Sequence, residues 1–250
     1  MNNKSNPKAK HGIVAMIDAL GVRNSTIQES IEFIENIQNI LKSLPDFMSG
    51  YFEGETKKKK KFETEPPTLI AFGDTFIFSW QMKPEELPHY LPDVGFFLSF
   101  VIISGLENKM ALRGAVSVGE YIQYDSTVLG PAIADVAAWY DSPEMIGVIA
   151  TPRCGQFLNC LNESQEIVST EFLKYPVPLK GGSKKDLWLA GWPELINYDP
   201  DAKSYLKEYY ELIRRFQIPK GTEDKYFNTE EFVRWTLSKY EDKSKPGKQV

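Results

Sequence analysis

The chain has few of the residues that build sulfur or imidazole metal sites. It contains two cysteines, Cys154 and Cys160, which form no CxxC pair, and two histidines, His11 and His89, which stand far apart. Zinc sites use closely spaced Cys and His ligands, so a zinc site is not expected. The metal ligands that remain are carboxylate oxygens, which suit magnesium or manganese beside a phosphate substrate.

The chain also lacks an excess of positive charge and a membrane-length apolar run. Lys and Arg number 29 against 34 Asp and Glu, a net charge of −5, so no general positive field attracts nucleic acid or an anionic membrane. The apolar run at 94–106 is shorter than the roughly 20 residues that a bilayer span needs, and it predicts a buried helix. The basic start is followed by no signal-peptide pattern. We therefore expect a cytoplasmic protein without nucleic-acid or membrane partners.

What is present is an alternation of strand and helix patterns. Strands are expected at 11–17, 69–80 (a hairpin turning at Gly73-Asp74), 112–122, 147–150 and 175–192 (a pair of strands around 180–182), and helices at 25–45, 94–106, 130–140, from 151, 201–216 and 229–241. Residues 47–67, with the lysine run 57–61, predict a surface loop. The order predicts an α+β fold with a ferredoxin-like antiparallel sheet and helices on one face. We expect one domain over 1–195 and a helical extension over 196–250.

Two acids stand at the ends of expected strands. Asp18 follows the apolar run 11–17, and Asp74 lies at the tip of the hairpin. In a ferredoxin-like sheet these strands are neighbours, so both carboxylates can point into one space and hold two divalent cations. The alternative is that Asp18 only caps a helix and Asp74 only satisfies a turn.

Five segments, taken in order, resemble the catalytic domain of class III adenylate and guanylate cyclases. They are 15–21 (AMIDALG), 72–74 (FGD), 112–119 (LRGAVSVG), 130–137 (GPAIADVA) and 179–181 (LKG). The resemblance implies that Asp18, Asp74 and the Ala19 carbonyl bind two Mg²⁺ or Mn²⁺ ions. It also implies that Lys180 binds phosphate and that each site is completed across a homodimer, with the helix from Gly130 contributing in trans.

The sequence departs from the purine cyclases where they read the base and the ribose. Ile70 stands where those enzymes carry a base-reading lysine, and Asp135 and Trp139 stand near the places of their asparagine and arginine. With these departures, the runs 130–133 (GPAI), 138–141 (AWYD) and 146–152 (IGVIATP) are similar to the pyrimidine cyclases of bacterial Pycsar antiphage defence. That likeness implies synthesis of cyclic UMP or cyclic CMP from UTP or CTP, with the product acting on a separate effector protein.

The remaining candidate residues have open alternatives. Arg113 enters a buried strand, where an unpaired guanidinium is costly, so it must face either phosphate or a fixed acid. Lys180 precedes two glycines and either meets the triphosphate or is a solvated turn residue. Asp135 and Tyr140 are candidates for substrate contact, or belong to the surface and core of their helix. A purine cyclase and an inactive cyclase homologue that serves as a regulatory dimer remain alternatives for the whole chain.

Overall fold

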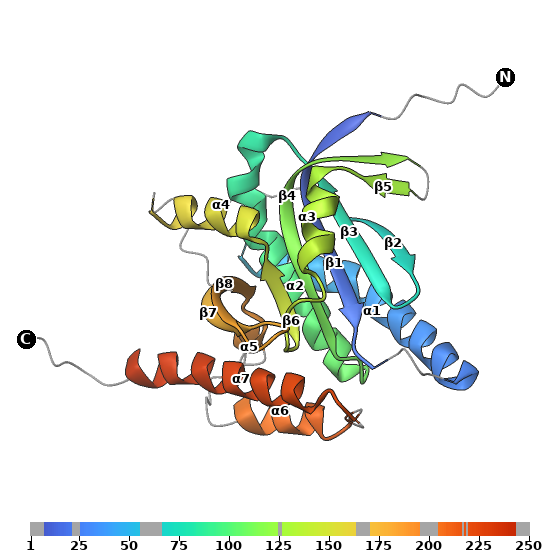
Figure 1. Cartoon of the computed structure of the whole chain (residues 1–250), viewed down its shortest axis with the longest axis vertical. Coiled ribbons are helices and arrows are strands. Elements are labelled where there is room, and N and C mark those ends of the chain that lie inside the picture. Colours follow the sequence, from blue (N-terminus) through green and yellow to red (C-terminus); the bar gives the residue numbers. More distant parts are fainter. Residues whose placement is uncertain are drawn as a thin grey trace, which may run out of the picture.

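The described part of the chain is built around one mixed β-sheet of eight strands with helices on both faces (Figure 1). The computed structural model describes residues 8–21, 26–55, 67–124, 127–163, 171–195, 205–216, 218 and 220–243. The α+β class predicted from the sequence is confirmed.

The expected elements occur in the expected order, and a strand at 127–129, a 3₁₀ helix at 84–86 and a short helix at 192–195 were not predicted. The strands are β1 (Ala9–Ala19), β2 (Thr68–Phe72), β3 (Thr75–Gln81), β4 (Leu112–Tyr124), β5 (Thr127–Leu129), β6 (Gly147–Ala150), β7 (Phe172–Pro178) and β8 (Lys184–Ala190). The helices are α1 (Ile27–Glu55), α2 (Leu87–Glu107), α3 (Pro131–Trp139), α4 (Pro152–Glu163), α5 (Trp192–Leu195), α6 (Tyr205–Ile213) and α7 (Glu223–Lys243), with a short 3₁₀ helix η2 (Pro84–Glu86) before α2.

The strands lie in the order β2-β3-β1-β4-β6-β8-β7, and β5 pairs with β4. Strand β1 is antiparallel to both β3 and β4, whereas β4 and β6 are parallel. The prediction of a purely antiparallel sheet is therefore wrong at this pair. The chain leaves β4 through the β5 hairpin and α3, and α3 returns it to the end at which β4 began, so β6 starts in the same direction as β4.

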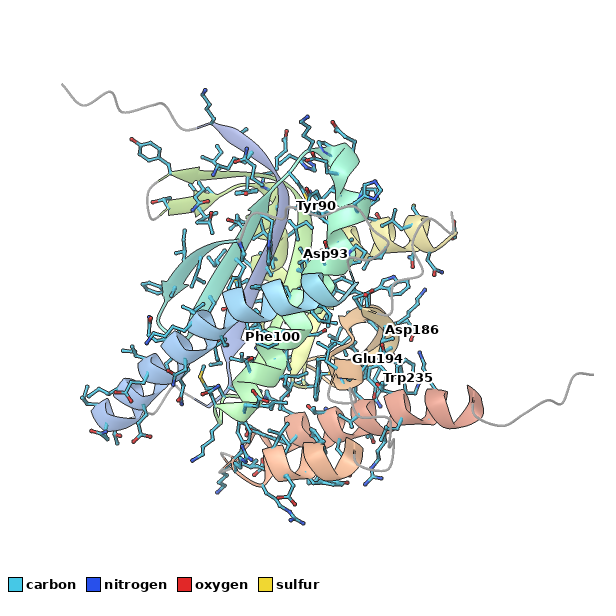
Figure 2. All side chains as sticks on the ribbon, turned by 180° about the vertical axis from the view of Figure 1, so that it is seen from behind. Tyr90, Asp93, Phe100, Asp186, Glu194 and Trp235 are labelled. Atoms are coloured by element: carbon cyan, nitrogen blue, oxygen red, sulfur yellow. The ribbon has the colours of Figure 1, made fainter. Side chains whose placement is uncertain are left out.

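The prediction that the helices lie on one face of the sheet is also wrong. Helices α1 and α2 lie behind the sheet in Figure 1 and in front of it in Figure 2, and α3 lies on the opposite face. Side chains alternate between the two faces along a strand. Ser117 of β4 hydrogen-bonds to Asp135 of α3, and its pairing partner on β1 is Val14. Even-numbered residues of β1, Asp18 among them, therefore face α3.

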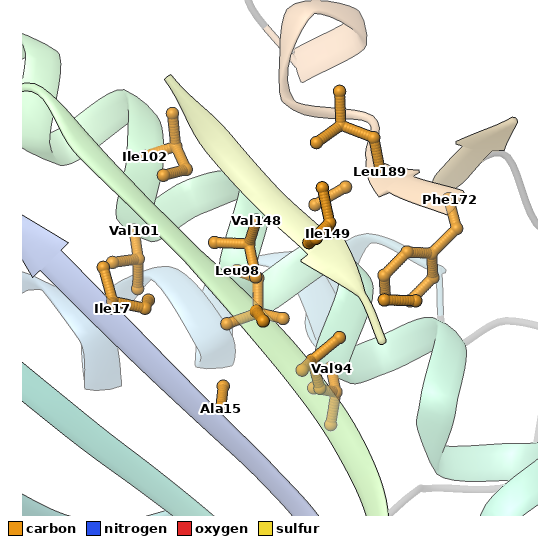
Figure 3. Packing of buried hydrophobic residues seen from close by; sticks show 14 of the residues in the cluster. Ala15, Ile17, Val94, Leu98, Val101, Ile102, Val148, Ile149, Phe172 and Leu189 are labelled. Atoms are coloured by element: carbon orange, nitrogen blue, oxygen red, sulfur yellow. The ribbon is translucent and has the colours of Figure 1, made fainter. Parts of the chain in front are cut away.

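The core forms between the sheet and α2. Figure 3 shows apolar side chains of α2 packed against those of β1 and β6. Helix α2 contributes Val94, Leu98 and Val101, β1 contributes Ala15 and Ile17, and β6 contributes Val148. The buried helix predicted at 94–106 is confirmed, since 13 residues of α2 are buried. Residues 84–107 are long and apolar enough to cross a membrane, but 67% of the apolar window is buried inside the protein, as in the core helix of a soluble protein.

The hairpin is confirmed, and one helix boundary is not. Phe72 pairs with Thr75 across a two-residue turn, in which Gly73 has φ +60° and Asp74 has a negative φ. These backbone angles suit a type II′ turn, which has glycine at the first of its two central positions. The prediction that helix 25–45 ends at Pro45 is wrong, because α1 continues to Glu55. The helix contains Pro45 although proline has no backbone N–H to donate to the preceding turn. The lysine run 57–61 lies outside the described residues, as does Ser25.

The C-terminal helices pack on the end of the sheet. Phe232 of α7 contacts Tyr175 of β7, with ring centroids 4.8 Å apart, and Tyr209 of α6 contacts Trp192 at 6.2 Å. All four rings are buried. The division of the chain at residues 195 and 196 stays a prediction.

Candidate active site

The end of β1 and the tip of the β2–β3 hairpin bring the two candidate metal acids together. Asp18 pairs with Thr75 on one side and with Arg113 on the other. The backbone N–H of Ala19 donates to the carbonyl of Asp74 at 3.0 Å. The main chains of the two acids are therefore fixed beside each other at one end of the sheet.

Tyr140, directly after α3, is within electrostatic range of these acids in the same chain. Burial raises the pKa of its phenol above the ordinary value. The negative charges of Asp18, Asp141 and Asp74 raise this pKa further, and the Arg113 guanidinium opposes them. A phenol that responds to all four charges is close to them. The resemblance implies that Tyr140 contributes from the second chain with the helix from Gly130, so its position near the acids of its own chain differs from that expectation. Substrate contact by Tyr140 stays a prediction.

Arg113 is buried and meets a fixed acid. Its Nη2 lies 3.5 Å from Oδ2 of Asp18, and its Nη1 donates to the Pro143 carbonyl at 3.2 Å. Nη1 is also 3.9 Å from Oε1 of Glu144. Of the two environments expected for Arg113, the structure places it in the one with a fixed acid; a phosphate contact stays a prediction.

Lys180 stands in the turn between β7 and β8, opposite the segment that follows α3. Its ammonium donates to the Asp141 carboxylate, and its backbone N–H donates to the Ser142 carbonyl at 2.9 Å. Burial opposes the charged form of Asp141, but the hydrogen bond and charge of Lys180, helped by Arg113, lower the pKa of Asp141. Lys180 is 48% exposed, so the ammonium is bonded within the chain and remains open to solvent.

Asp135 belongs to a separate cluster. Its Oδ2 accepts hydrogen bonds from the hydroxyls of Ser117 and Thr151, both at 2.6 Å. Ser117 is four residues beyond Arg113 on β4, which corresponds to about 13 Å along the strand. Within one chain the structure therefore keeps Asp135 away from the Asp18 end of the sheet.

Ile70 lies on the same face as Asp18 but contributes no polar group. It pairs with Ile77 of β3, which in turn pairs with Met16 of β1. Met16 is two residues from Asp18 on the α3 face, so Ile70 is part of an apolar row beside the acids. Its side chain is half-buried on the outermost strand of the sheet.

The donor set fits a hard divalent cation. No group of three or more His, Cys, Asp or Glu side chains arranged for a metal occurs within the described residues. Asp18 and Asp74, which both carry carboxylates, are adjacent at the strand ends through the backbone bond from Ala19 to Asp74. Magnesium commonly takes one or two protein carboxylates and completes its shell with water and phosphate oxygens.

Sequence reasoning missed two acids of this site. Asp141 pairs with Lys180, and Glu144 lies against Arg113 and Lys225. Both follow α3 in a segment without strand or helix periodicity, so only the folded chain brings them to their partners. A cavity of about 700 Å³, lined in part by Lys10, is at the opposite end of β1 from Asp18, and none of the predicted site residues lines it.

Comparison with known proteins gives no family for this chain. No protein-family model matches it, and no curated protein matches it either.

Proposed function

We propose that the protein is a nucleotide cyclase of the class III type. It converts UTP or CTP to the 3′,5′-cyclic nucleotide and pyrophosphate, and the product activates a separate effector protein in antiphage defence. The observation that carries the proposal is the position of Asp18 and Asp74, joined by the bond from Ala19 N–H to the Asp74 carbonyl at the ends of neighbouring strands.

The topology supports this proposal. The chain runs strand, helix, strand, strand, helix, strand through β4, and these four strands lie in the order β2-β3-β1-β4. That is the order of a ferredoxin-like arrangement, on which the motif resemblance depends. Strands β6, β8 and β7 extend the sheet beyond it.

Asp18 and Asp74 would hold the divalent cations, with the Ala19 carbonyl as the further ligand that the resemblance implies. Bound Mg²⁺ or Mn²⁺ would polarise the α-phosphate and lower the pKa of the ribose 3′-hydroxyl that attacks it. The chain's own part is to place charge. The exposed Lys180 ammonium can leave Asp141 for the triphosphate, and Arg113 holds the Asp18 carboxylate in position.

Exposed apolar side chains at both ends of the sheet support a homodimer. Phe72, beside the site, pairs with Thr75, the partner of Asp18, and its side chain is 85% exposed. Leu129 of β5 pairs with Ile122 at the opposite end of β4 from Arg113, and it is 64% exposed. Apolar groups on an open sheet suit a second copy of the chain, which would bring its own α3, with Asp135, toward the acids.

A second candidate, an inactive homologue acting as a regulatory dimer, is favoured by the internal pairs. Arg113 is 3.5 Å from Asp18, and Lys180 is bonded to Asp141, so the charges of the site already have partners in the free chain. A purine cyclase is the other enzymatic alternative. Ile70, with no polar group at the expected base-reading position, argues against it.

The test is incubation of purified protein with ATP, GTP, CTP or UTP and Mn²⁺, followed by mass identification of the products. Cyclic UMP or cyclic CMP with pyrophosphate is the expected result, and the Asp74→Asn protein is the control. Cyclic AMP or cyclic GMP as the main product would instead identify a purine cyclase. No product from any triphosphate would leave the regulatory dimer as the better account.

A further inference from the structure

A row of alternating charges leads from the candidate metal site to the C-terminal helix. Asp18 of β1 is 3.5 Å from Arg113 of β4, and Arg113 is 3.9 Å from Glu144, in the segment before β6. The second carboxylate oxygen of Glu144 is 3.1 Å from Nζ of Lys225 on α7. The row thus joins residues 18 and 225 through two intermediate side chains.

All four side chains of this row are shielded from water. Their exposed fractions are 14% for Asp18, 7% for Arg113, 24% for Glu144 and 13% for Lys225. Charges interact more strongly where water is excluded. The Nε of Arg113 is buried without a hydrogen-bond partner in the described part of the chain, so the two acids and the Pro143 carbonyl fix this guanidinium.

Side chains of helix α7 also hydrogen-bond to the backbone at and after Glu144, in the middle of the row. Asn228 donates from Nδ2 to the Glu144 carbonyl at 2.7 Å. The backbone N–H of Ile146 donates to Oγ1 of Thr229 at 2.8 Å, and Thr229 is fully buried. Three residues of α7 therefore hold Glu144 and the segment around it.

We infer that α7 is a working part of the site, because Lys225 and Asn228 position Glu144, and Glu144 sets how strongly Arg113 neutralises Asp18. The inference rests on the proposed function, since it concerns the affinity of Asp18 and Asp74 for a divalent cation. Glu144, Lys225 and Asn228 are positioning residues that act on the cation through Arg113.

The sign of each charge gives opposite expectations for two substitutions. In Glu144→Gln, Arg113 loses one of its two acids and neutralises Asp18 more fully, so the cation binds more weakly. In Lys225→Met, the Glu144 charge is no longer balanced by an ammonium, so Arg113 is drawn from Asp18 and the cation binds more tightly. Damage to the fold would weaken binding in both variants.

The chain offers a matched control pair. Lys184 of β8 lies 3.8 Å from Glu231 of α7, with 58% and 63% of the side chains exposed. This pair also links the sheet to α7, but it has no contact with Arg113. Lys184→Met and Glu231→Gln therefore change the net charge by the same amounts as the test variants without touching the row.

The experiment is a Mn²⁺ titration of the full-length proteins, followed by the electron paramagnetic resonance signal of free Mn²⁺, with thermal unfolding of each variant. We expect the Kd for Mn²⁺ to rise about threefold to tenfold in Glu144→Gln and to fall about twofold in Lys225→Met, as unit charges in a shielded site would cause. The double variant should resemble Glu144→Gln, and both control variants should resemble the unaltered protein.

The outcomes separate the inference from the proposed function. Equal Kd values in the two test variants and the unaltered protein, or a rise in both variants together with a lower Tm, would show that α7 only supports the fold. If Asp74→Asn binds Mn²⁺ as well as the unaltered protein, the metal site itself is wrong, and with it the proposed function and this inference.

Discussion

The two faces of strands β1 and β4 differ in chemistry although they are formed by alternate residues of the same strands. Toward α2, β1 presents Ile13, Ala15 and Ile17, all fully buried. Figure 3 shows Ala15 and Ile17 in this packing. Toward α3, the same two strands present Asp18, Arg113 and other polar groups that bond to one another or to α3. Alternation along a strand is what permits this separation.

The two faces contribute differently to stability and to chemistry. Apolar side chains on the α2 face remove surface from water, which stabilises the fold. Charges on the α3 face are held in partly buried pairs, which add little to stability and a great deal to the local field. Substitutions on the two faces should therefore affect different measurements.

The largest effect is expected from Asp74→Asn on the charged side. The substitution removes the proposed metal-binding charge from a half-buried position in a turn, so turnover should fall by on the order of a thousandfold or more, while the free energy of unfolding changes by less than about 0.5 kcal/mol. Initial rates with UTP and CTP and urea unfolding measure the two quantities. Turnover at the unaltered rate would remove Asp74 from the site.

Mixed dimers test whether the α3 face of one chain serves the acids of the other. Asp135→Asn keeps an acceptor for Ser117 and Thr151, so it should fold, and we expect it to be inactive. Co-expressed with Asp74→Asn, it should regain about half of the unaltered activity per mixed dimer, because one of the two sites then carries neither defect.

Two results would contradict the shared site. Purified mixed dimers as inactive as either parent would place the whole site within one chain, where Tyr140 already lies near Asp18 and Asp74. An Asp135→Asn protein with unaltered turnover would remove Asp135 from catalysis. Size-exclusion chromatography with light scattering confirms that the mixed species is a dimer.

Much of the fold could be predicted because its signals are local. A few neighbouring residues are enough to predict each strand or hairpin. The apolar run before Asp18 predicts β1, the Gly73-Asp74 turn predicts the β2–β3 hairpin, and the alternation in 112–122 predicts β4, and the structure has all three. The parallel pairing of β4 and β6 could not be predicted. It depends on the direction in which α3 returns the chain, for which residues 130–140 carry no local signal.

The candidate site was only partly predictable for the same reason. Acids at strand ends can be found from the pattern, and the hairpin brings Asp74 beside Ala19 through a local turn. The partners of Arg113 and Lys180 lie 31 and 39 positions away from them, at Glu144 and Asp141. Those pairings depend on tertiary packing, which periodicity and turn chemistry do not encode.

On the apolar face, Leu98→Ala should reduce stability and leave chemistry intact. Leu98 is fully buried between α2 and the sheet, and removing its branched end leaves a cavity there. The free energy of unfolding should fall by about 3 kcal/mol, while turnover per folded molecule stays the same. Phe227→Ala on α7, where the ring is 65% exposed, is the control and should change stability by less than about 0.5 kcal/mol.

The smallest effect concerns Asp93, the one acid of α2 with a buried oxygen that lacks a hydrogen-bond partner among the described residues (Figure 2). Burial raises its pKa from 3.8 to about 6. The folded protein therefore keeps this proton while the unfolded chain releases it, so stability is complete below about pH 4 and is lost as the pH rises toward 6. Replacement by asparagine removes the titration.

Urea unfolding of the unaltered protein and of Asp93→Asn at pH 4, 5, 6 and 7 measures this loss. The two should be nearly equal at pH 4, and at pH 7 the variant should be more stable by on the order of 1–3 kcal/mol, a range that allows for partial contact of the carboxyl with water. The difference between the two proteins cancels the titration of all other groups. If the free energies of unfolding of the two proteins change with pH in parallel, the Asp93 carboxylate is charged in the folded protein without loss of stability. The side of the sheet covered by α2 would then tolerate a charge as readily as the side covered by α3.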